Sequence, residues 1–321
     1  MHMKRIITIL LCLTLLLSLA SLLTGCKGGP ITTADNNGTT IVCTNFAGYD
    51  FVRSMLAYYT ENGGAGVVQL VMLGKPGQDM HSFEPTAQDI ITLANADIVI
   101  CTGAEGWLDA ALKSSGNTVC RVISMMEVSE TVAGEDHDHE HGGEDCSLIE
   151  QDEHVWLSLT NANRICFAIA EALMAVDSEN VEAWNVAYVR YGDDLTALIT
   201  EYLDMMRGAV RFNVVVADRN PFVYFFDDWG LNCLAAFPGC SSETSASFET
   251  QDKLIRYTKE WGLSYIFVME GSDGKVAQVV ASETGAEILT LNSLQVVTDY
   301  DNTTYLGIMR QNLENLKKAL H

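Results

Sequence analysis

The sequence predicts an α/β fold of two lobes, each with a mainly parallel sheet flanked by helices, joined by one long linking helix. From position 40 onward, short β-branched runs alternate with longer helical periods, which is the pattern of a parallel sheet covered by helices. The alternation occurs twice, on either side of a helical region without proline. Two such series predict two lobes with a ligand cleft between them.

The first series predicts a lobe over 39–177. Strands are expected at 40–44, 67–72, 98–101 and 119–123, and helices at 49–59, 85–96 and 106–113. Thr86 and Asp89 form a capping-box-like start for the second of these helices, so His81 falls on the loop that leads into it. Open α/β sheets gather their ligands on loops of this kind.

The linking region predicts a helix after Ser158 and then one long helix over 181–206, within a linker at 178–207. Gly192 lies within the long helical pattern, but no proline accompanies it, so one continuous helix is expected. Gly192 is the position where any bend in that helix is expected. The second lobe is expected over 208–321, with strands at 214–217, 233–236, 265–268 and 288–291 and helices at 221–229, 248–261, 275–284 and 304–320.

The N-terminus has the features of an export signal. Lys4 and Arg5 precede an apolar stretch over 6–23, and a Thr-Gly pair stands directly before Cys26. These residues resemble a bacterial lipobox, so we expect a signal peptide over 1–25, acylation of Cys26 and a flexible tether over 26–38. The alternative is a membrane-spanning helix, since the stretch approaches ~20 residues. The acylated protein would be anchored outside the cytoplasmic membrane.

Charge and cysteine content exclude several classes of function. Cleavage before Cys26 removes two of the 19 basic residues and none of the 42 acidic ones, so the mature charge becomes −25, which repels nucleic acid. Seven cysteines remain, without a CxxC pair, so a disulfide framework or zinc ribbon is not expected. Cys43 and Cys101 lie in apolar runs and are predicted to be core thiols. A bond between Cys233 and Cys240 remains an alternative.

The placement of the seven histidines indicates a metal. His81 and His154 stand in the runs Gln78-Asp-Met-His-Ser-Phe-Glu84 and Asp152-Glu-His-Val-Trp156. Three others alternate with acids in the loop 134–145, namely His137, His139 and His141. Neutral imidazole is the commonest metal ligand, and neighbouring carboxylates suit a divalent cation. The loop predicts weak auxiliary sites that raise the local metal concentration, although a disordered acidic linker has the same composition.

The order of these motifs resembles the cluster A-I solute-binding proteins of zinc and manganese ABC importers. The resemblance rests on the lipobox, His-x-Phe-Glu-Pro at His81, the histidine-rich loop, Asp152-Glu-His-Val-Trp-Leu-Ser158, the long helix and the C-terminal run Thr304-Tyr-Leu-Gly-Ile-Met-Arg-Gln-Asn312. It covers essentially the whole mature chain. It implies a non-enzymatic protein that captures a divalent metal and passes it to a membrane permease.

The resemblance implies His81 and His154 as two metal ligands. Zinc binders of the family carry a third histidine where this chain has Arg219, whose guanidinium cannot coordinate a metal. Their fourth ligand aligns with Asn292, whose amide oxygen is a weaker ligand than a carboxylate. Glu243 is the candidate that completes the shell from the second lobe, either as a ligand or as an ion-pair partner of Arg219. Cys240 and Asp218 are further alternatives.

Zinc is favoured over manganese, because nitrogen ligands suit zinc and manganese prefers oxygen. Two other classes remain open from the residues alone. One is a metal-dependent hydrolase that uses Asp152 or Glu153 as a general base, although the chain contains no HExxH motif. The other is an adhesin in which a metal stabilises the fold.

Overall fold

The computed structural model describes residues 38–131, 151–239 and 246–321. Several predicted features lie outside these residues: the signal peptide, the lipid-attachment residue Cys26, tether residues 26–37, Glu243, Cys240 and the loop that carries His137, His139 and His141. Gly38, the last residue of the predicted tether, is instead the first residue of β1. Within the described residues, no helix is both long and apolar enough to cross a membrane.

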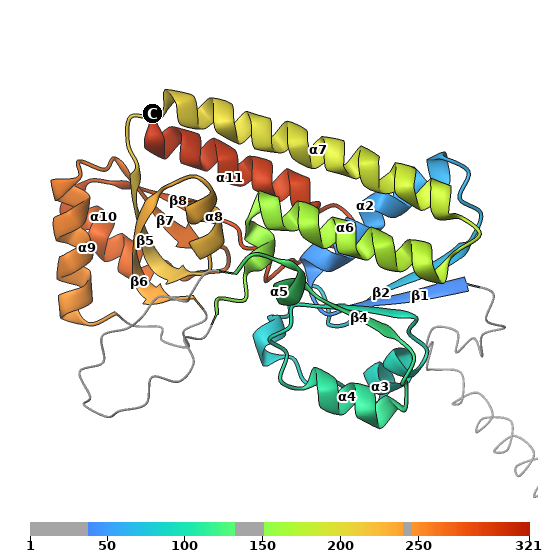
Figure 1. Cartoon of the computed structure of the whole chain (residues 1–321). Helices are drawn as coiled ribbons and strands as arrows, with labels where there is room; N and C mark the ends of the chain where they lie inside the picture. The colour runs from blue at the N-terminus through green and yellow to red at the C-terminus, as the bar shows by residue number, and fades with distance from the viewer. Residues whose placement is uncertain (1–37, 132–150, 240–245) are drawn as a thin grey trace, which may run out of the picture. The chain divides into compact units, whose positions relative to one another are not determined.

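The first sheet contains four parallel strands, as the sequence predicts, and Figure 1 labels three of them, β1, β2 and β4. The order across the sheet is β2-β1-β3-β4. Their bounds are β1 (Gly38–Cys43), β2 (Val67–Met72), β3 (Ile98–Cys101) and β4 (Arg121–Ser124). β3 is buried along its whole length, which agrees with its apolar sequence. β4 begins two residues later than predicted. The side-chain oxygen of Asn117 accepts the backbone N–H groups of Val119 (3.2 Å) and Cys120 (3.0 Å), which forms a turn there instead.

Helices cover both faces of the first sheet. They are α2 (Phe46–Glu61), α3 (Ala87–Ala94), α4 (Leu108–Ser115) and α5 (Met125–Val128), with two one-turn 3₁₀ helices, η1 (Met80–Ser82) and η2 (Val155–Leu157). α2 begins earlier than predicted, because Asn45 caps it by accepting the N–H of Gly48 at 2.9 Å. The capping box of Thr86 and Asp89 is confirmed at the start of α3.

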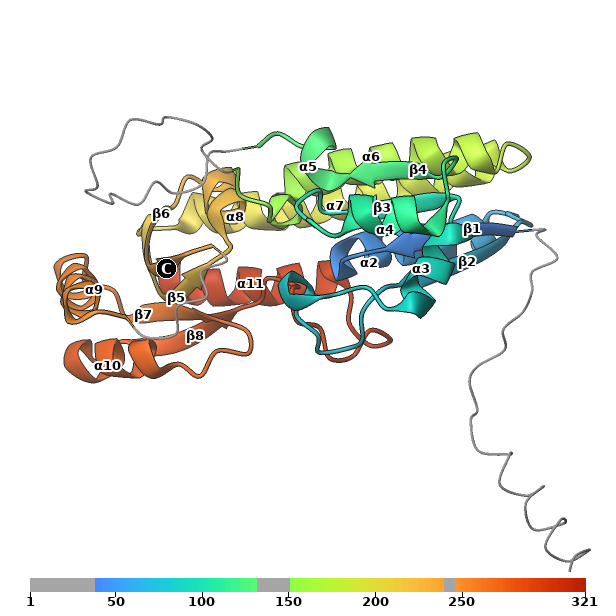
Figure 2. The ribbon, with the colours of Figure 1, turned by 90° about the horizontal axis from the view of Figure 1, so that it is seen from below.

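The second sheet repeats the topology of the first, with parallel strands in the order β6-β5-β7-β8. Its strands are β5 (Asn213–Asn220), β6 (Asn232–Pro238), β7 (Tyr265–Met269) and β8 (Glu287–Leu291), and its helices are α8 (Val223–Asp228), α9 (Phe248–Glu260) and α10 (Lys275–Thr284). Figure 2 shows α9 and α10 side by side at the outer face of this sheet, where they enclose a separate small core.

One long helix, α7, links the two sheets, and α11 packs along it. After α6 (Leu159–Val176), α7 (Val181–Gly208) runs without a break through Gly192, which confirms the predicted single linking helix. α11 (Tyr305–Leu320) packs beside α7 (Figure 1), and the hydroxyl of Tyr202 donates to the carbonyl of Met309 at 2.6 Å. The segment before α11 returns the chain to the first lobe, where the N–H of Tyr305 donates to Asp50 of α2. α11 then runs along α7 toward the second sheet, and its Leu320 carbonyl accepts the N–H of Val210 at 2.9 Å.

The main hydrophobic core extends across both sheets. It joins Ile41 of β1, Val214 of β5 and Tyr305 of α11, each less than 3% exposed. The thiols of Cys43 and Cys101 are buried as predicted, and burial raises the pKa of each well above its usual range. Because this core is continuous, it fixes the carboxyl ends of the strands of the two sheets relative to each other.

Candidate metal site

A cavity of about 560 Å³ lies at the carboxyl ends of the strands of both sheets. Its wall includes residues that follow β1, β3, β6 and β8, namely Asn45, Thr102, Gly239 and Gln295. This is where parallel α/β sheets bind ligands, because the loops after the strands converge at the topological switch point. The described lining contains four carboxylates, from Asp79, Glu105, Asp152 and Glu153, and no lysine or arginine. Such a wall attracts cations.

His81 is positioned by η1, a single turn between β2 and α3. Asp79 caps this turn by accepting the backbone N–H of His81 at 3.0 Å. The His81 side chain is 34% exposed, so it lies at the accessible side of the site. The prediction placed His81 on a loop, because a three-residue helix is too short to show a period in the sequence.

His154 is positioned at the start of η2 and is fully buried. One carboxylate oxygen of Asp152 accepts the backbone N–H of His154 at 2.9 Å and lies 3.0 Å from its ring Nδ1. Tyr224 of α8 donates its hydroxyl to the carbonyl of Asp152 at 2.7 Å. The second lobe therefore helps to hold the Asp152–His154 segment in place.

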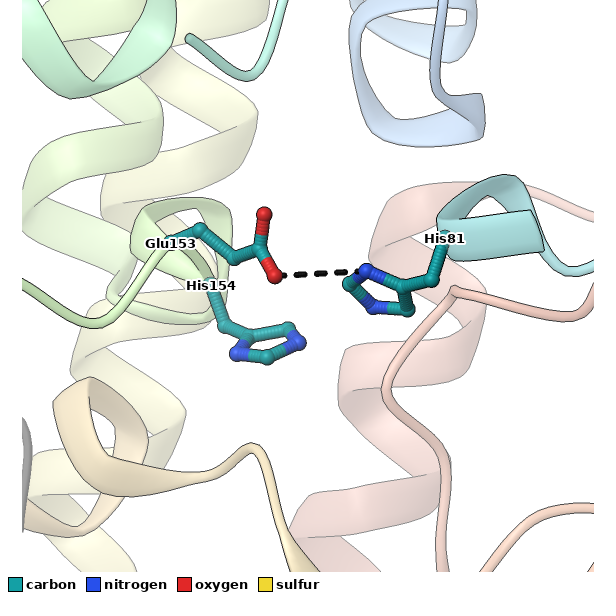
Figure 3. Close-up of side chains that lie close together, drawn as sticks. All are labelled: His81, Glu153 and His154. Atoms are coloured by element: carbon teal, nitrogen blue, oxygen red, sulfur yellow. Dashed lines mark ion pairs between the residues drawn. The ribbon is translucent and has the colours of Figure 1, made fainter. Parts of the chain in front are cut away.

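The two imidazoles lie together, with ring centroids 5.8 Å apart. Glu153 joins them from the η2 side, and its Oε1 lies 3.3 Å from His81 Nδ1 (Figure 3). One ligand atom from each of these three side chains lies within 4.8 Å of the others, so the group has the dimensions of a metal site. The sequence alone suggests Glu153 only as a general base of a hydrolase. Its position directly before His154 in the chain is the feature that could have identified it as a neighbour of the metal site.

Gln295 reaches the same point from the second lobe. Its Nε2 lies 3.3 Å from His81 Nε2 and in close hydrogen-bond contact with His154 Nε2. The loop after β8 that carries Gln295 is held by Glu270, which accepts the N–H and the hydroxyl of Ser293. Burial raises the pKa of Glu270 above its usual value, while these hydrogen bonds oppose the shift. No pattern in the sequence identified Gln295.

Among the predicted residues that the structure describes, Asn292, Asp218 and Arg219 are not brought to the two histidines. The side-chain oxygen of Asn292 accepts the N–H of Leu294 at 2.8 Å and so shapes the turn before Gln295. Asp218 is engaged by the backbone N–H groups of Arg219 (2.8 Å) and Met269 (3.3 Å). Neither Asn292, Asp218 nor Arg219 is among the residues that line the cavity.

The hydrogen bonding of the rings decides which nitrogen can coordinate. A carboxylate can only accept, so the Nδ1 of each neutral ring carries the proton toward Asp152 or Glu153. The lone pair is then on Nε2 of both rings. A carboxylate behind a ligating imidazole is the arrangement that fixes the tautomer and raises ligand basicity at zinc sites.

Comparison with known families gives one match over most of the chain. The family described as ZnuA, zinc-uptake complex component A, periplasmic, matches residues 53–319. The chain is 27% identical over 296 residues to the high-affinity zinc uptake system protein ZnuA of Bacillus subtilis, covering 89% of this chain and 90% of the relative. It is 26% identical to the zinc-binding protein AdcA of Streptococcus pyogenes, covering 86% of this chain and only 55% of that longer protein.

Solved structures share the fold. The crystal structure of the metal-dependent lipoprotein YcdH of Bacillus subtilis superposes with a TM-score of 0.71 at 25% identity, covering 88% of this chain and 99% of the other. A zinc-bound mutant variant of AdcAII from Streptococcus pneumoniae gives a TM-score of 0.70 at 25% identity, covering 89% of this chain and 99% of the other.

Proposed function

This chain belongs to the family of zinc-uptake complex component A proteins, and on that premise we propose that it binds a divalent cation in the cavity between its two sheets. Zinc is the first choice. The observation that carries the proposal is the pair of imidazoles, His81 and His154. Their Nε2 atoms both contact the amide nitrogen of Gln295, while carboxylates face their Nδ1 atoms. The family consists of binding proteins, which favours binding over hydrolysis.

The proposed ligands are Nε2 of His81 and Nε2 of His154. Glu153 orients His81 and supplies negative charge beside the cation, and Asp152 does the same for His154. From the second lobe, Gln295 is the described residue in contact with both rings. Glu243 stays a proposed ligand from the sequence. So does Asn292, but its side-chain oxygen accepts the N–H of Leu294 in this structure and would have to leave that turn to bind a cation. Manganese is the alternative cargo, disfavoured by the two nitrogen ligands.

The cation is released to a partner. We propose delivery to the permease of an ABC importer, from a position anchored by an acylated Cys26 outside the cytoplasmic membrane. Support comes from the family match and from the related zinc-binding lipoprotein AdcA of Streptococcus pneumoniae, 26% identical over 287 residues. The loop with His137, His139 and His141 is proposed to gather zinc for the cavity.

Zinc titration of His81→Ala and His154→Ala tests the site. Each variant removes one of two nitrogen ligands, so we expect zinc affinity to fall at least about 100-fold, or about 2.8 kcal/mol. Competition calorimetry on protein stripped of metal measures this, with a parallel manganese titration.

His321→Ala is the matched control, because this histidine lies at the C-terminus with Nε2 3.0 Å from the carbonyl of Met205. It should bind zinc like the wild type. Wild-type affinity in both site variants would show that the cation binds elsewhere.

A further inference from the structure

Gln295 contacts both candidate ligands at the atoms that would bind the metal. Its amide nitrogen lies between Nε2 of His81, at 3.3 Å, and Nε2 of His154. The rings belong to the first lobe and the amide to a loop 214 and 141 residues further along the chain. One side chain of the second lobe therefore pairs with both imidazoles at once.

The direction of these hydrogen bonds follows from the other side of each ring. Asp152 faces Nδ1 of His154 at 3.0 Å, and Glu153 faces Nδ1 of His81 at 3.3 Å, so both Nδ1 atoms are donors. Each neutral ring then presents an accepting Nε2 to Gln295. Two acceptors require two donors, and the amide NH₂ carries two N–H groups. The amide oxygen cannot replace it, because it has no proton to donate.

The loop after β8 is built to hold Gln295 at this place. Leu294, the residue before it, has φ +62°, a left-handed conformation that costs a non-glycine residue energy. Contacts from both lobes offset this cost. Ser293 donates its N–H and hydroxyl to Glu270 at 2.8 Å and 2.6 Å, and the Trp156 indole donates to the Ser293 carbonyl at 2.9 Å. Strain that is fixed from several sides is characteristic of functional sites.

We propose that Gln295 is a built-in substitute for the cation, an inference that rests on the proposed function. In the metal-free protein, its NH₂ group satisfies the Nε2 lone pairs of both imidazoles, one of which belongs to the fully buried His154. When the metal arrives, the amide reverses by a half-turn about its last bond and presents its oxygen. An amide offers a donor on one side and an acceptor on the other, so one side chain serves both states.

This arrangement makes Gln295 a determinant of affinity. The metal must displace two hydrogen bonds and gains a neutral oxygen rather than a carboxylate. A carboxylate at position 295 would differ from the amide in two ways at pH 8, where imidazole is neutral. It cannot donate to Nε2, and it adds a negative charge beside the cation. Metal-free stability and zinc affinity should therefore change in opposite directions.

The test uses full-length mature protein at pH 8, with metal removed and its absence verified. Gln295→Met keeps the approximate size without a donor, and we expect it to lower the metal-free melting temperature by about 2–4 °C. Gln295→Glu should lower that melting temperature as well, yet raise zinc affinity at least tenfold. Gln151→Glu adds the same charge to the same cavity wall and should change the melting temperature by less than about 1 °C.

Imidazole-selective ¹H–¹⁵N correlation spectra of the metal-free wild type provide an independent readout. We expect protons on Nδ1 and hydrogen-bonded, unprotonated Nε2 in His81 and His154. A proton on Nε2, or a metal-free Gln295→Met variant that melts like the wild type, would overturn the proposal. Both readouts are taken without metal, so a wild type that binds no zinc would refute the proposed function separately.

Discussion

Glu270 shows how one buried carboxylate controls a loop of the candidate site. It stands at the end of β7 and accepts both the N–H and the hydroxyl of Ser293. Its burial raises its pKa, which means that ionisation is costly there and that the two hydrogen bonds recover part of the cost. The strained Leu294 and the contact made by Gln295 depend on this anchor.

Replacing Glu270 by alanine should destabilise the protein and weaken zinc binding together. The substitution leaves two donors of Ser293 without their acceptor in a buried place, which costs on the order of 2–3 kcal/mol. Glu270→Gln keeps one acceptor and should recover part of the loss. Urea unfolding of metal-free protein and zinc titration measure both effects. Unchanged stability in Glu270→Ala would mean that the loop holds its shape by other contacts.

The two histidines of the site could be predicted from the sequence, but Gln295 could not. His81 and His154 were predicted from motifs, and the structure places them together. Gln295 was missed because an amide in a loop has no period or spacing, and only the fold brings it to rings 214 and 141 residues away. The family resemblance instead selected Asn292, three residues earlier, which the structure uses to hold the turn.

At the scale of elements, α8 of the second lobe caps a helix of the first. Asp228 accepts the Ser158 hydroxyl and the Leu159 backbone N–H, both at 2.9 Å, at the start of α6. A carboxylate suits a helix N-terminus. Burial is nevertheless the larger effect and raises the pKa of Asp228 to about 6.

Asp228→Asn should change the pH dependence of stability. The folded state binds the Asp228 proton more tightly than the unfolded chain, whose value is 3.8. Protonation therefore stabilises the fold, and this contribution is lost as the pH rises from about 4 through about 6. Over this window, wild type should lose up to about 3 kcal/mol relative to the variant. Urea unfolding at pH 4.5, 5.5 and 7 measures it, and parallel profiles would contradict the assignment.

The sequence located elements better than their ends. Apolar runs predicted β2 and β3 at their observed bounds, and helical periodicity predicted α7 through Gly192. The starts of β4 and α2 differ from their predicted positions because a nearby side chain accepts backbone N–H groups there. Asn117 does so before β4, and Asn45 does so at α2. The one-turn helices η1 and η2 were not predicted, because three residues show no period.

At the scale of the whole molecule, the chain crosses between the lobes more than once. α7 carries it to the second sheet, and the segment before α11 brings it back to α2. There Arg53 forms an ion pair with Asp50 and donates to the carbonyls of Tyr300 and Thr303. Asp50 is fully buried and also accepts the N–H of Tyr305 at 2.5 Å. This brace joins the start of the fold to its end.

Arg53→Met should lower the free energy of unfolding by about 3–5 kcal/mol, because it leaves the buried Asp50 without its cation. Methionine keeps much of the apolar stem, so the effect reports mainly the lost charge and hydrogen bonds. Arg207→Met is the control, because Arg207 and its partner Asp204 are 75% and 62% exposed. It should cost less than about 1 kcal/mol. Equal effects of the two variants in chemical denaturation would show that the brace adds no stability.

The shared core has a consequence for the survival of the protein. Both walls of the cavity belong to one core, so a cation bound there opposes unfolding of the entire chain. With a free concentration about 100 times the dissociation constant, the gain is about 2.7 kcal/mol, which reduces the unfolded population about 100-fold. Proteases attack that population. Metal scarcity would thus shorten the lifetime of the protein, and the abundance of the protein would follow the supply of metal without any change in synthesis.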